Sequence, residues 1–351
     1  MKALFYIILF TAISATIWQI VKLFGLTKNE QITTKKENNI NGWLMLVTMI
    51  FLYVLMIYYM FFGGRDVLLP RQAGSIEGEH IDNLFAMTMG LILVVQFITQ
   101  FLVFYFTFKY RGNSDRRAAF FADSHKLELF WTVTPTIVLS GLIIYGLWTW
   151  NLVQDVTNKD DNPIYIELYA KQFQWEARYA GKDNILGEAN VRNIKGMNTT
   201  GVDMNDPNAQ DDITVLQEFH IPKGRKVVFQ VRSQDVLHSA YMPHFRAQIN
   251  AVPGMKTYMA YTPALTTEEM RKNPDIIRKV EGINKLRAEN SKELVAKGED
   301  ALEPYTFDYL LLCNKICGAS HYNMQMKLVV DEEADFNKWL ASQKTLAEKL
   351  N

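Results

Sequence analysis

The sequence predicts two structural classes in one chain: transmembrane helices in the N-terminal half, followed by an all-β domain. Long charge-free apolar stretches are confined to about the first 153 of the 351 residues. From about residue 163 onward, the pattern changes to short runs in which apolar and polar residues alternate, as in half-buried strands. Acidic and basic residues balance at 37 each, so the net charge gives no indication of a nucleic-acid partner.

Four apolar stretches are candidates for membrane helices, because a helix needs about 20 apolar residues to cross the hydrocarbon core. The last three meet this length easily. The first is at the lower limit, where a signal peptide is the alternative, but no small-residue cleavage site follows it. We therefore expect two helices in residues 1–64 and a helical hairpin in residues 84–154. The four stretches are 3–21, 43–64, 84–108 and 129–154.

The positions of lysine and arginine predict how these helices are oriented, since basic residues concentrate in cytoplasmic loops. The loops after the first and third stretches are rich in basic residues, whereas the loop after the second carries only Arg65 and Arg71. The first and third loops are therefore expected inside. The N-terminus and everything after residue 154 are expected outside. The basic residues of the two inner loops are Lys22, Lys28, Lys35 and Lys36, and Lys109, Arg111, Arg116, Arg117 and Lys126.

The outer domain, residues 155–335, is expected to be a small antiparallel sandwich or barrel. Turns are indicated at 222–224 (PKG) and 252–254 (VPG). Six runs have the composition and alternation of strands. They are 164–170, 172–179, 213–221, 226–233, 308–314 and 324–330.

Two segments interrupt the strand pattern and are expected to be insertions. Residues 181–212 are rich in Gly, Asn and Asp and are predicted to be loop, whereas residues 264–302 are charged and predicted to be helical. Within the first, DMNDPNAQDD (203–212) lacks the spacing and the closing glutamate of an EF-hand, so an Asx-rich turn is favoured over a calcium site. The tail from residue 331 is expected to form one short amphipathic helix, in 336–351.

Residues 313–324, CNKICGASHYNM, hold the only two cysteines of the chain. A disulfide would close a loop of three residues, which gains little stability and leaves His321 and Met324 unexplained. A structural zinc site is disfavoured by the C-x3-C-x3-H spacing and by the methionine. Thiolate, thioether and imidazole ligands together favour copper. A mononuclear blue-copper site needs one cysteine, but two thiolates can bridge two coppers.

A copper pair of this kind needs a second histidine from elsewhere in the chain. His238 lies in DVLHS (235–239), just after the strand predicted at 226–233 and beside a turn. Such a position suits a ligand at the rim of a barrel, although a lone histidine there would more often be an ordinary surface residue.

Three motifs together resemble subunit II of haem-copper cytochrome c oxidase. They are DVLHS with the later AVPG (251–254), the cysteine loop 313–324, and SHKLELFWTVTP (124–135), in the order and spacing of that family. The resemblance implies a cupredoxin-like β-barrel with a dinuclear copper A centre. It further implies a subunit that accepts electrons from a c-type cytochrome and passes them to haem in subunit I, where oxygen reduction is coupled to proton translocation. We expect a multi-pass protein of a bacterial inner (plasma) membrane, with the copper domain on the periplasmic side.

The resemblance also implies which residues hold the coppers. Two cysteines bridge the metals, and each copper is completed by one histidine and one weak ligand. The set is Cys313 and Cys317 as bridges, His238 and Met324 on one copper, and His321 with the main-chain carbonyl of Lys315 on the other. The family usually has a glutamate at the position of Lys315, where it helps to hold magnesium. A lysine cannot replace that carboxylate, so a magnesium site is not expected here.

Two further roles follow from the resemblance. Glu128, in the motif 124–135, matches the carboxylate that opens a proton-uptake channel, with an interfacial glutamate as the alternative. Phe173 and Trp175, in KQFQWEARY (171–179), match the aromatic run thought to admit the electron, with core packing as the alternative. The family usually begins that run with tryptophan, so the role is expected of this face and not of one ring.

The expected partners are oxidase subunit I, the other oxidase subunits and the donor cytochrome. Few carboxylates surround the first ligand motif, so we expect the donor to be a tethered cytochrome domain or part of an associated complex. The two additional helices are expected to dock a neighbouring subunit. No CxxCH motif is present, so no haem is expected in this chain. The alternatives are a copper-free quinol-oxidase-type subunit and a membrane-tethered zinc module. A nitrous oxide reductase would need a His-rich domain that the sequence lacks.

Overall fold

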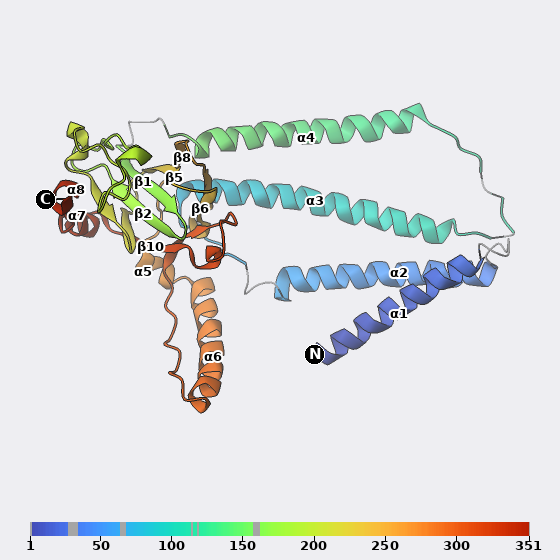
Figure 1. Ribbon diagram of the computed structural model, residues 1–351. Coiled ribbons are helices and arrows are strands. Elements are labelled where there is room, and N and C mark those ends of the chain that lie inside the picture. The colour runs from blue at the N-terminus through green and yellow to red at the C-terminus, as the bar shows by residue number, and fades with distance from the viewer. Residues whose placement is uncertain are drawn as a thin grey trace. The chain divides into compact units, whose positions relative to one another are not determined.

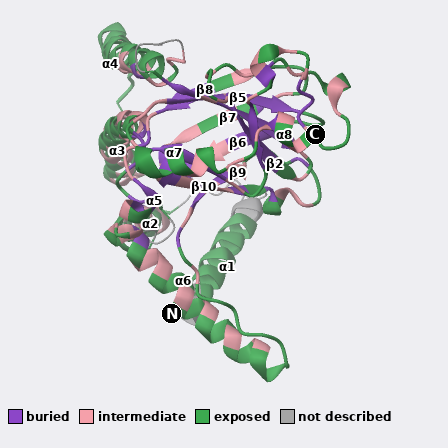
Figure 2. Cartoon of the chain, turned by 90° about the vertical axis from the view of Figure 1, so that its left-hand side faces the viewer, coloured by how far each residue is buried: buried purple, intermediate pink, exposed green. Residues whose placement is uncertain are grey.

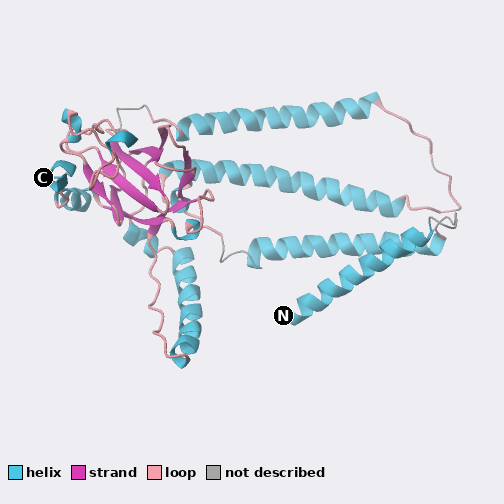
Figure 3. Cartoon of the chain, in the orientation of Figure 1, coloured by secondary structure: helices cyan, strands magenta, loops and turns pink. Residues whose placement is uncertain are grey.

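The computed structural model describes residues 2–26, 34–63, 68–113, 115–117, 119–156 and 162–350 (Figure 1). The chain divides into two compact units, one of residues 1–62 and 92–124, the other of residues 63–91 and 125–351. Figure 3 shows that the strands are confined to the second unit, while both units contain helix.

The described residues of the N-terminal part of the chain form four helices. Three of them are long and apolar enough to cross a membrane, namely α2 with its terminal turn, α3 and α4. In α1 the apolar segment found among the described residues is Ile8–Lys22, shorter than a full span, so the first predicted span stays a prediction. The bounds are α1 Lys2–Leu26, α2 Lys35–Tyr58 with a π-helical turn Tyr59–Gly63, α3 Ile76–Lys109 and α4 His125–Val153.

Helix α3 begins at Ile76, eight residues before the apolar stretch that predicted it. Its polar first turns contact the β domain. The carboxylate of Glu77 accepts hydrogen bonds from the Thr262 backbone N–H (2.7 Å) and hydroxyl (3.1 Å), and Asp82 forms an ion pair with Arg246 at 2.8 Å. The sequence-based start was wrong because hydropathy detects only the apolar part of a helix that continues into the polar domain.

The β domain is a sandwich of two five-stranded sheets. The first has the order β3-β2-β1-β5-β8 and the second β4-β10-β9-β6-β7. Figure 2 shows buried residues concentrated on these strands. The strands are β1 Ile164–Lys171, β2 Gln174–Tyr179, β3 Ile213–Val215, β4 Glu218–Pro222, β5 Val227–Ser233, β6 His238–Met242, β7 Ala247–Ala251, β8 Thr257–Tyr261, β9 Tyr309–Cys313 and β10 Gln325–Asp331.

The predicted class, membrane helices followed by an all-β domain, is confirmed, but three details of the sheets differ. The sheets are mixed, since β1 pairs with β5 and β4 with β10 in parallel. The strand predicted at 213–221 is divided into β3 and β4, which belong to different sheets, because the chain crosses the sandwich at Leu216 and Gln217. Strands β6 to β8, of five residues each, were not predicted.

The segment 181–212 is loop with short 3-10 turns, and its end contacts a buried ion network on the first sheet. Arg178 donates to Glu167 at 2.7 Å and also pairs with Asp212, while Arg232 pairs with the other oxygen of Glu167. Burial alone would raise the pKa of Glu167, but the two guanidinium groups outweigh it and lower this pKa to about 2. These charges are almost fully buried, so they stabilise the domain only as a complete set.

The Asx-turn interpretation of 203–212 agrees with the structure. One carboxylate oxygen of Asp203 accepts from the Asn205 backbone N–H at 3.0 Å, and one of Asp206 accepts from Asn208 at 3.1 Å. These carboxylates therefore cap backbone turns.

The segment 264–302 is helical, as predicted, with α5 Thr267–Arg271 and α6 Pro274–Ala296. The returning chain is fixed to α6 by two hydrogen bonds between Asn284 and the backbone of Tyr305, at 2.6 and 3.1 Å.

The C-terminal tail differs from the single helix predicted for 336–351. It forms two helices, α7 Glu333–Ala341 and α8 Leu346–Leu350. Trp339 of α7 stacks on His220 at 4.0 Å between ring centroids, and the Leu346 backbone N–H donates to the carbonyl of Asp212 at 2.6 Å. The tail therefore bends to follow the β domain, which hydropathy alone does not indicate.

Candidate metal centre

The residues predicted to bind metal come together at one end of the second sheet. His238 is the first residue of β6 and Cys313 is the last residue of β9. These strands are antiparallel neighbours, with Ala240 paired to Cys313, so the start of one lies beside the end of the other. The loop that follows β9 carries the remaining candidates and leads into β10. Two segments 75 residues apart in sequence are thereby joined.

The first cysteine lies at the centre of one half of this group. The Sγ of Cys313 is 3.8 Å from the Sγ of Cys317, 3.8 Å from Nδ1 of His238 and 3.2 Å from the carbonyl oxygen of Lys315. His238, Cys313 and Cys317 each place a ligand atom within 4.8 Å of the others. Among the described residues, this is the only group of three or more His, Cys, Asp or Glu side chains so arranged.

The second cysteine contacts the other two candidate ligands. The Sγ of Cys317 is 3.5 Å from Nδ1 of His321 and 3.8 Å from the Sδ of Met324. Each sulfur atom thus has one imidazole and one weak donor as its neighbours. These distances join the candidate ligands to sulfur atoms and not to a metal. The assignment of each ligand to a particular copper therefore stays a prediction.

Burial separates the inner and outer sides of the loop. His238 (0% exposed), Met324 (1%) and Cys317 (6%) point inward, whereas the side chain of Ile316 between them in sequence is 88% exposed. These three donors are shielded from water, whereas Cys313 and His321 are half-buried. The exposed side of the loop is free to face another protein surface.

Without a cation, the environment of the two cysteines favours the protonated, neutral thiol at Cys317. Burial raises the pKa of the Cys317 thiol to about 11, and the neighbouring Cys313 adds to this rise. Two adjacent thiolates repel each other, so a metal charge must compensate them when they ionise. Soft sulfur with imidazole matches the preference of copper, so the residues present fit a copper pair.

Two residues that the sequence analysis did not single out, Asp235 and Gln172, support this group: Asp235 contacts His238, and Gln172 contacts Asp235. Asp235 accepts a hydrogen bond from Nε2 of His238 at 2.8 Å, which leaves the lone pair on Nδ1, the ring atom 3.8 Å from the Sγ of Cys313. Asp235 also accepts from the backbone N–H of Gln172 at 2.7 Å. Burial would raise the pKa of Asp235, but these hydrogen bonds outweigh it and lower the pKa. Asp235 stands in the DVLHS motif, three residues before its histidine. This position was the signal in the sequence from which its role could have been predicted.

The two aromatic candidates occupy different environments. Trp175 is fully buried in the core, 6.3 Å from His238 between ring centroids and at 64° to it. Phe173 is half-buried at the β1–β2 turn, and its ring lies 2.8 Å from where a Cβ on Gly318 would stand. Of the two, only Phe173 is open to solvent and in contact with the ligand loop.

Glu128 is not part of the metal group. It lies in the first turn of α4, where its carboxylate is 3.3 Å from Nδ1 of His125 and both side chains are exposed. The whole of α4 has 29 residues, a length of ~43 Å, and Val153 is at the end of the helix opposite Glu128. Any role of Glu128 therefore belongs to a different step from that of the cysteines.

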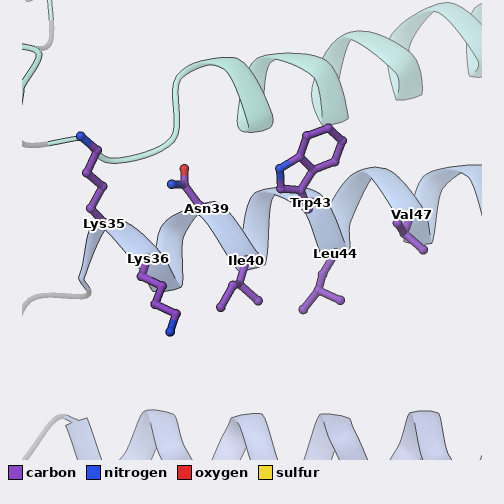
Figure 4. A pocket seen from close by; sticks show the side chains of 7 residues that line it. All are labelled: Lys35, Lys36, Asn39, Ile40, Trp43, Leu44 and Val47. Carbon is purple, nitrogen blue, oxygen red and sulfur yellow. The ribbon is translucent and has the colours of Figure 1, made fainter.

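A groove of about 650 Å³ runs along α2 (Figure 4). None of the predicted site residues contributes to it. Its described lining is Lys35, Lys36, Asn39, Ile40, Trp43, Leu44 and Val47.

The chain is similar to known oxidase subunits. Residues 67–148 match the family model described as "Cytochrome C oxidase subunit II, transmembrane domain". The "Alternative cytochrome c oxidase subunit 2" of Bradyrhizobium diazoefficiens is 32% identical over 269 residues, which cover 76% of this chain and 82% of the relative. The "Cytochrome c oxidase subunit 2" of Alkalihalophilus pseudofirmus is 23% identical over 264 residues, which cover 74% of this chain and 57% of the relative.

Solved structures are also similar to part of the chain. One of them is the periplasmic domain of subunit II of the cytochrome oxidase of Bradyrhizobium japonicum, with 19% identity and a TM-score of 0.29. The match covers 51% of this chain and 91% of that structure.

Proposed function

Because this chain belongs to the cytochrome c oxidase subunit II family, as a membrane subunit of a haem-copper terminal oxidase, we propose that it admits electrons to the enzyme through a dinuclear copper A centre. The donor is a c-type cytochrome, and the acceptor is haem in subunit I.

The observation that carries the proposal is the convergence of two sulfurs, two imidazoles, a thioether and a carbonyl at one end of the β sandwich. The separation of 3.8 Å between the sulfurs of Cys313 and Cys317 lets one metal ion contact both. Five of the six donors are side chains of the right chemical type, and the sixth is the Lys315 carbonyl, which does not depend on the side chain. The complete ligand set favours this function over a copper-free quinol-oxidase-type subunit.

The protein's own contribution is to hold the ligands rigidly. His238 and Cys313 are fixed by strand pairing, and Asp235 fixes the ring of His238. A copper pair bound there would supply a one-electron redox couple shared between two metals. Because the ligands sit on strands and in a buried loop, they need to move little when the charge changes.

The remaining assignments follow from the same family membership. The distribution of basic residues supports a copper domain on the periplasmic side of the membrane. Phe173 is the ring through which we propose the electron passes, since it is both accessible and in contact with the ligand loop. Glu128, in the first turn of α4, is proposed to take up protons that are then passed to subunit I.

The test is copper stoichiometry and paramagnetic resonance of the purified full-length chain. We expect two coppers per chain and a mixed-valence signal shared by two nuclei. Cys317→Ala or His238→Ala should abolish the signal, whereas Lys315→Ala should keep it, because only the carbonyl is used. One copper per chain, or binding of zinc in preference to copper, would contradict the dinuclear assignment. Loss of copper in Lys315→Ala equal to that in Cys317→Ala would show that the loop is misassigned.

A further inference from the structure

The turn between β1 and β2 lies against both ligand-bearing segments, although it supplies none of the proposed ligands. The two strands are antiparallel and end with Lys171 paired to Gln174, so the turn consists of Gln172 and Phe173. These strands belong to the first sheet, whereas the proposed ligands come from the second sheet and its loop. The turn is therefore where the two layers of the sandwich meet at the metal end.

The backbone of the turn is connected to one ligand. The N–H of Gln172 donates to Oδ2 of Asp235 at 2.7 Å, while Oδ1 of the same carboxylate accepts from Nε2 of His238 at 2.8 Å. Oδ1 also accepts from the backbone N–H of Val236 at 2.7 Å. The position of the His238 ring is thus linked to the position of the turn through one carboxylate.

The side chain of the turn is connected to another ligand. Nε2 of Gln172 donates to the main-chain carbonyl of Cys317. The next residue, Gly318, has a φ of +141°, and a Cβ built there would lie 2.9 Å from the Gln172 amide and 2.8 Å from the Phe173 ring. Glycine is favoured at 318 because other residues rarely adopt this φ, and a larger residue would also displace the ends of these two side chains.

We propose that Gln172 is a positioning residue of the metal centre, whose peptide N–H and side-chain amide fix His238 and Cys317 relative to each other. One residue holds both segments, so the distance between a histidine ligand and a bridging sulfur is set by the first sheet. Groups that orient metal ligands typically change metal affinity by 10- to 100-fold when they are removed. This inference rests on the proposed copper centre, but it concerns residues that the centre itself does not include.

The experiment uses the full-length chain loaded with copper and three variants. Gln172→Ala removes the side-chain donor and keeps the peptide N–H. Gln172→Glu keeps the size but replaces the donor with a carboxylate. Gln174→Ala is the matched control, an exposed glutamine two residues away with no side-chain hydrogen bond given by the structure. The readouts are the rate at which an excess of chelator removes copper and the hyperfine pattern of the mixed-valence signal.

Gln172→Ala and Gln172→Glu should both release copper about tenfold faster than the wild type and show an altered hyperfine pattern. Gln174→Ala should match the wild type in both. Wild-type release rates and spectra in Gln172→Ala would overturn the inference. So would a defect in only one of the two Gln172 variants, since either charge or volume would then be responsible. An equal loss of thermal stability in the copper-free chain would assign Gln172 a purely structural role.

The proposed function and this inference fail in different ways. If the wild-type chain itself binds no copper pair, the proposed function is wrong. If it binds two coppers and the Gln172 variants retain them as well as the wild type does, only the positioning role is wrong.

Discussion

The β domain buries its apolar side chains, whereas the membrane helices leave most of theirs exposed. In the sandwich, Ile166, Leu168 and Phe229 are completely buried by the chain itself. In the apolar windows of α3 and α4 no residue is buried, and in that of α2 only 6% are. Figure 2 shows this contrast between strands and helices. The domain that carries the proposed metal ligands is therefore stabilised by its own core, whereas the helices rely on lipid and on neighbouring subunits.

The largest effect should come from breaking the buried ion network of the β domain. Glu167→Ala leaves Arg178 and Arg232 without their shared partner in a region that excludes water, which should cost about 3–5 kcal/mol in the free energy of unfolding. The measurement is urea unfolding of the purified chain in detergent, followed by the near-UV circular dichroism of the aromatic residues.

The matched control for this variant is Asp335→Ala, which breaks an exposed ion pair with Lys338 and should change the midpoint little. Because the folded-state pKa of Glu167 is about 2, below its ordinary value of 4.5, its contribution is fully present above pH 4.5 and is lost as the pH falls toward 2. The wild type should therefore lose more stability than Glu167→Gln over that interval. If the free energy of unfolding fell by the same amount in both proteins between pH 4.5 and 2, this account would be contradicted.

A smaller effect is expected from removing an apolar side chain from the core. Leu168→Ala should destabilise the β domain by about 2–4 kcal/mol, because it leaves a cavity in a fully buried site. Leu139→Ala removes the same atoms from α4, where the side chain is 51% exposed, and should leave the unfolding of the β domain unchanged. Equal destabilisation by both variants would show that the helix and the sandwich unfold as one cooperative unit.

A functional difference between the two regions should appear at Glu128. Glu128→Gln should slow oxidase turnover at least about fivefold, or ~1 kcal/mol, because an amide cannot deliver a proton. It should leave the rate of copper reduction by the donor unchanged, since the proposed metal ligands lie in the β domain. The measurement compares steady-state oxygen consumption with rapid-mixing absorbance of the copper centre in the assembled oxidase. Equal slowing of both steps would assign Glu128 a structural role.

The smallest effect is expected from the salt concentration, acting on the rate of oxidase turnover. Leu237, Ile316 and Tyr322, next to the proposed ligands in sequence, are exposed at 47%, 88% and 87%, and none carries a charge. The exposed Lys315 is the one lysine, arginine, aspartate or glutamate of the loop 313–324, so a donor held beside this loop depends little on electrostatic steering. Turnover on the quinol substrate of an associated complex should change less than about twofold when salt is raised to 1 M, where the Debye length is ~3 Å. A steep fall that soluble cytochrome c restores would reject a tethered donor.

Local sequence determined the class of each half of the chain. Hydropathy located α2, α3 and α4, because about 20 apolar residues in a row are sufficient to identify a membrane helix. The loop 313–324 contains two thiols, an imidazole and a thioether within twelve residues, so the prediction of copper followed from the chemistry of these side chains. Both conclusions depend only on residues that are close in sequence.

The tertiary structure decided everything that depends on distant segments. The pairing of β6 with β9 brings His238 to Cys313, and the β1–β2 turn brings Gln172 to Cys317 across 145 residues. The same reason explains why the sequence did not reveal the parallel strand pairs or the division of 213–221 between two sheets. Periodicity reports which face of a segment is buried, but not which other segment covers it. That choice follows from packing the whole sandwich, so the ligand types could be predicted locally while their supporting contacts could not.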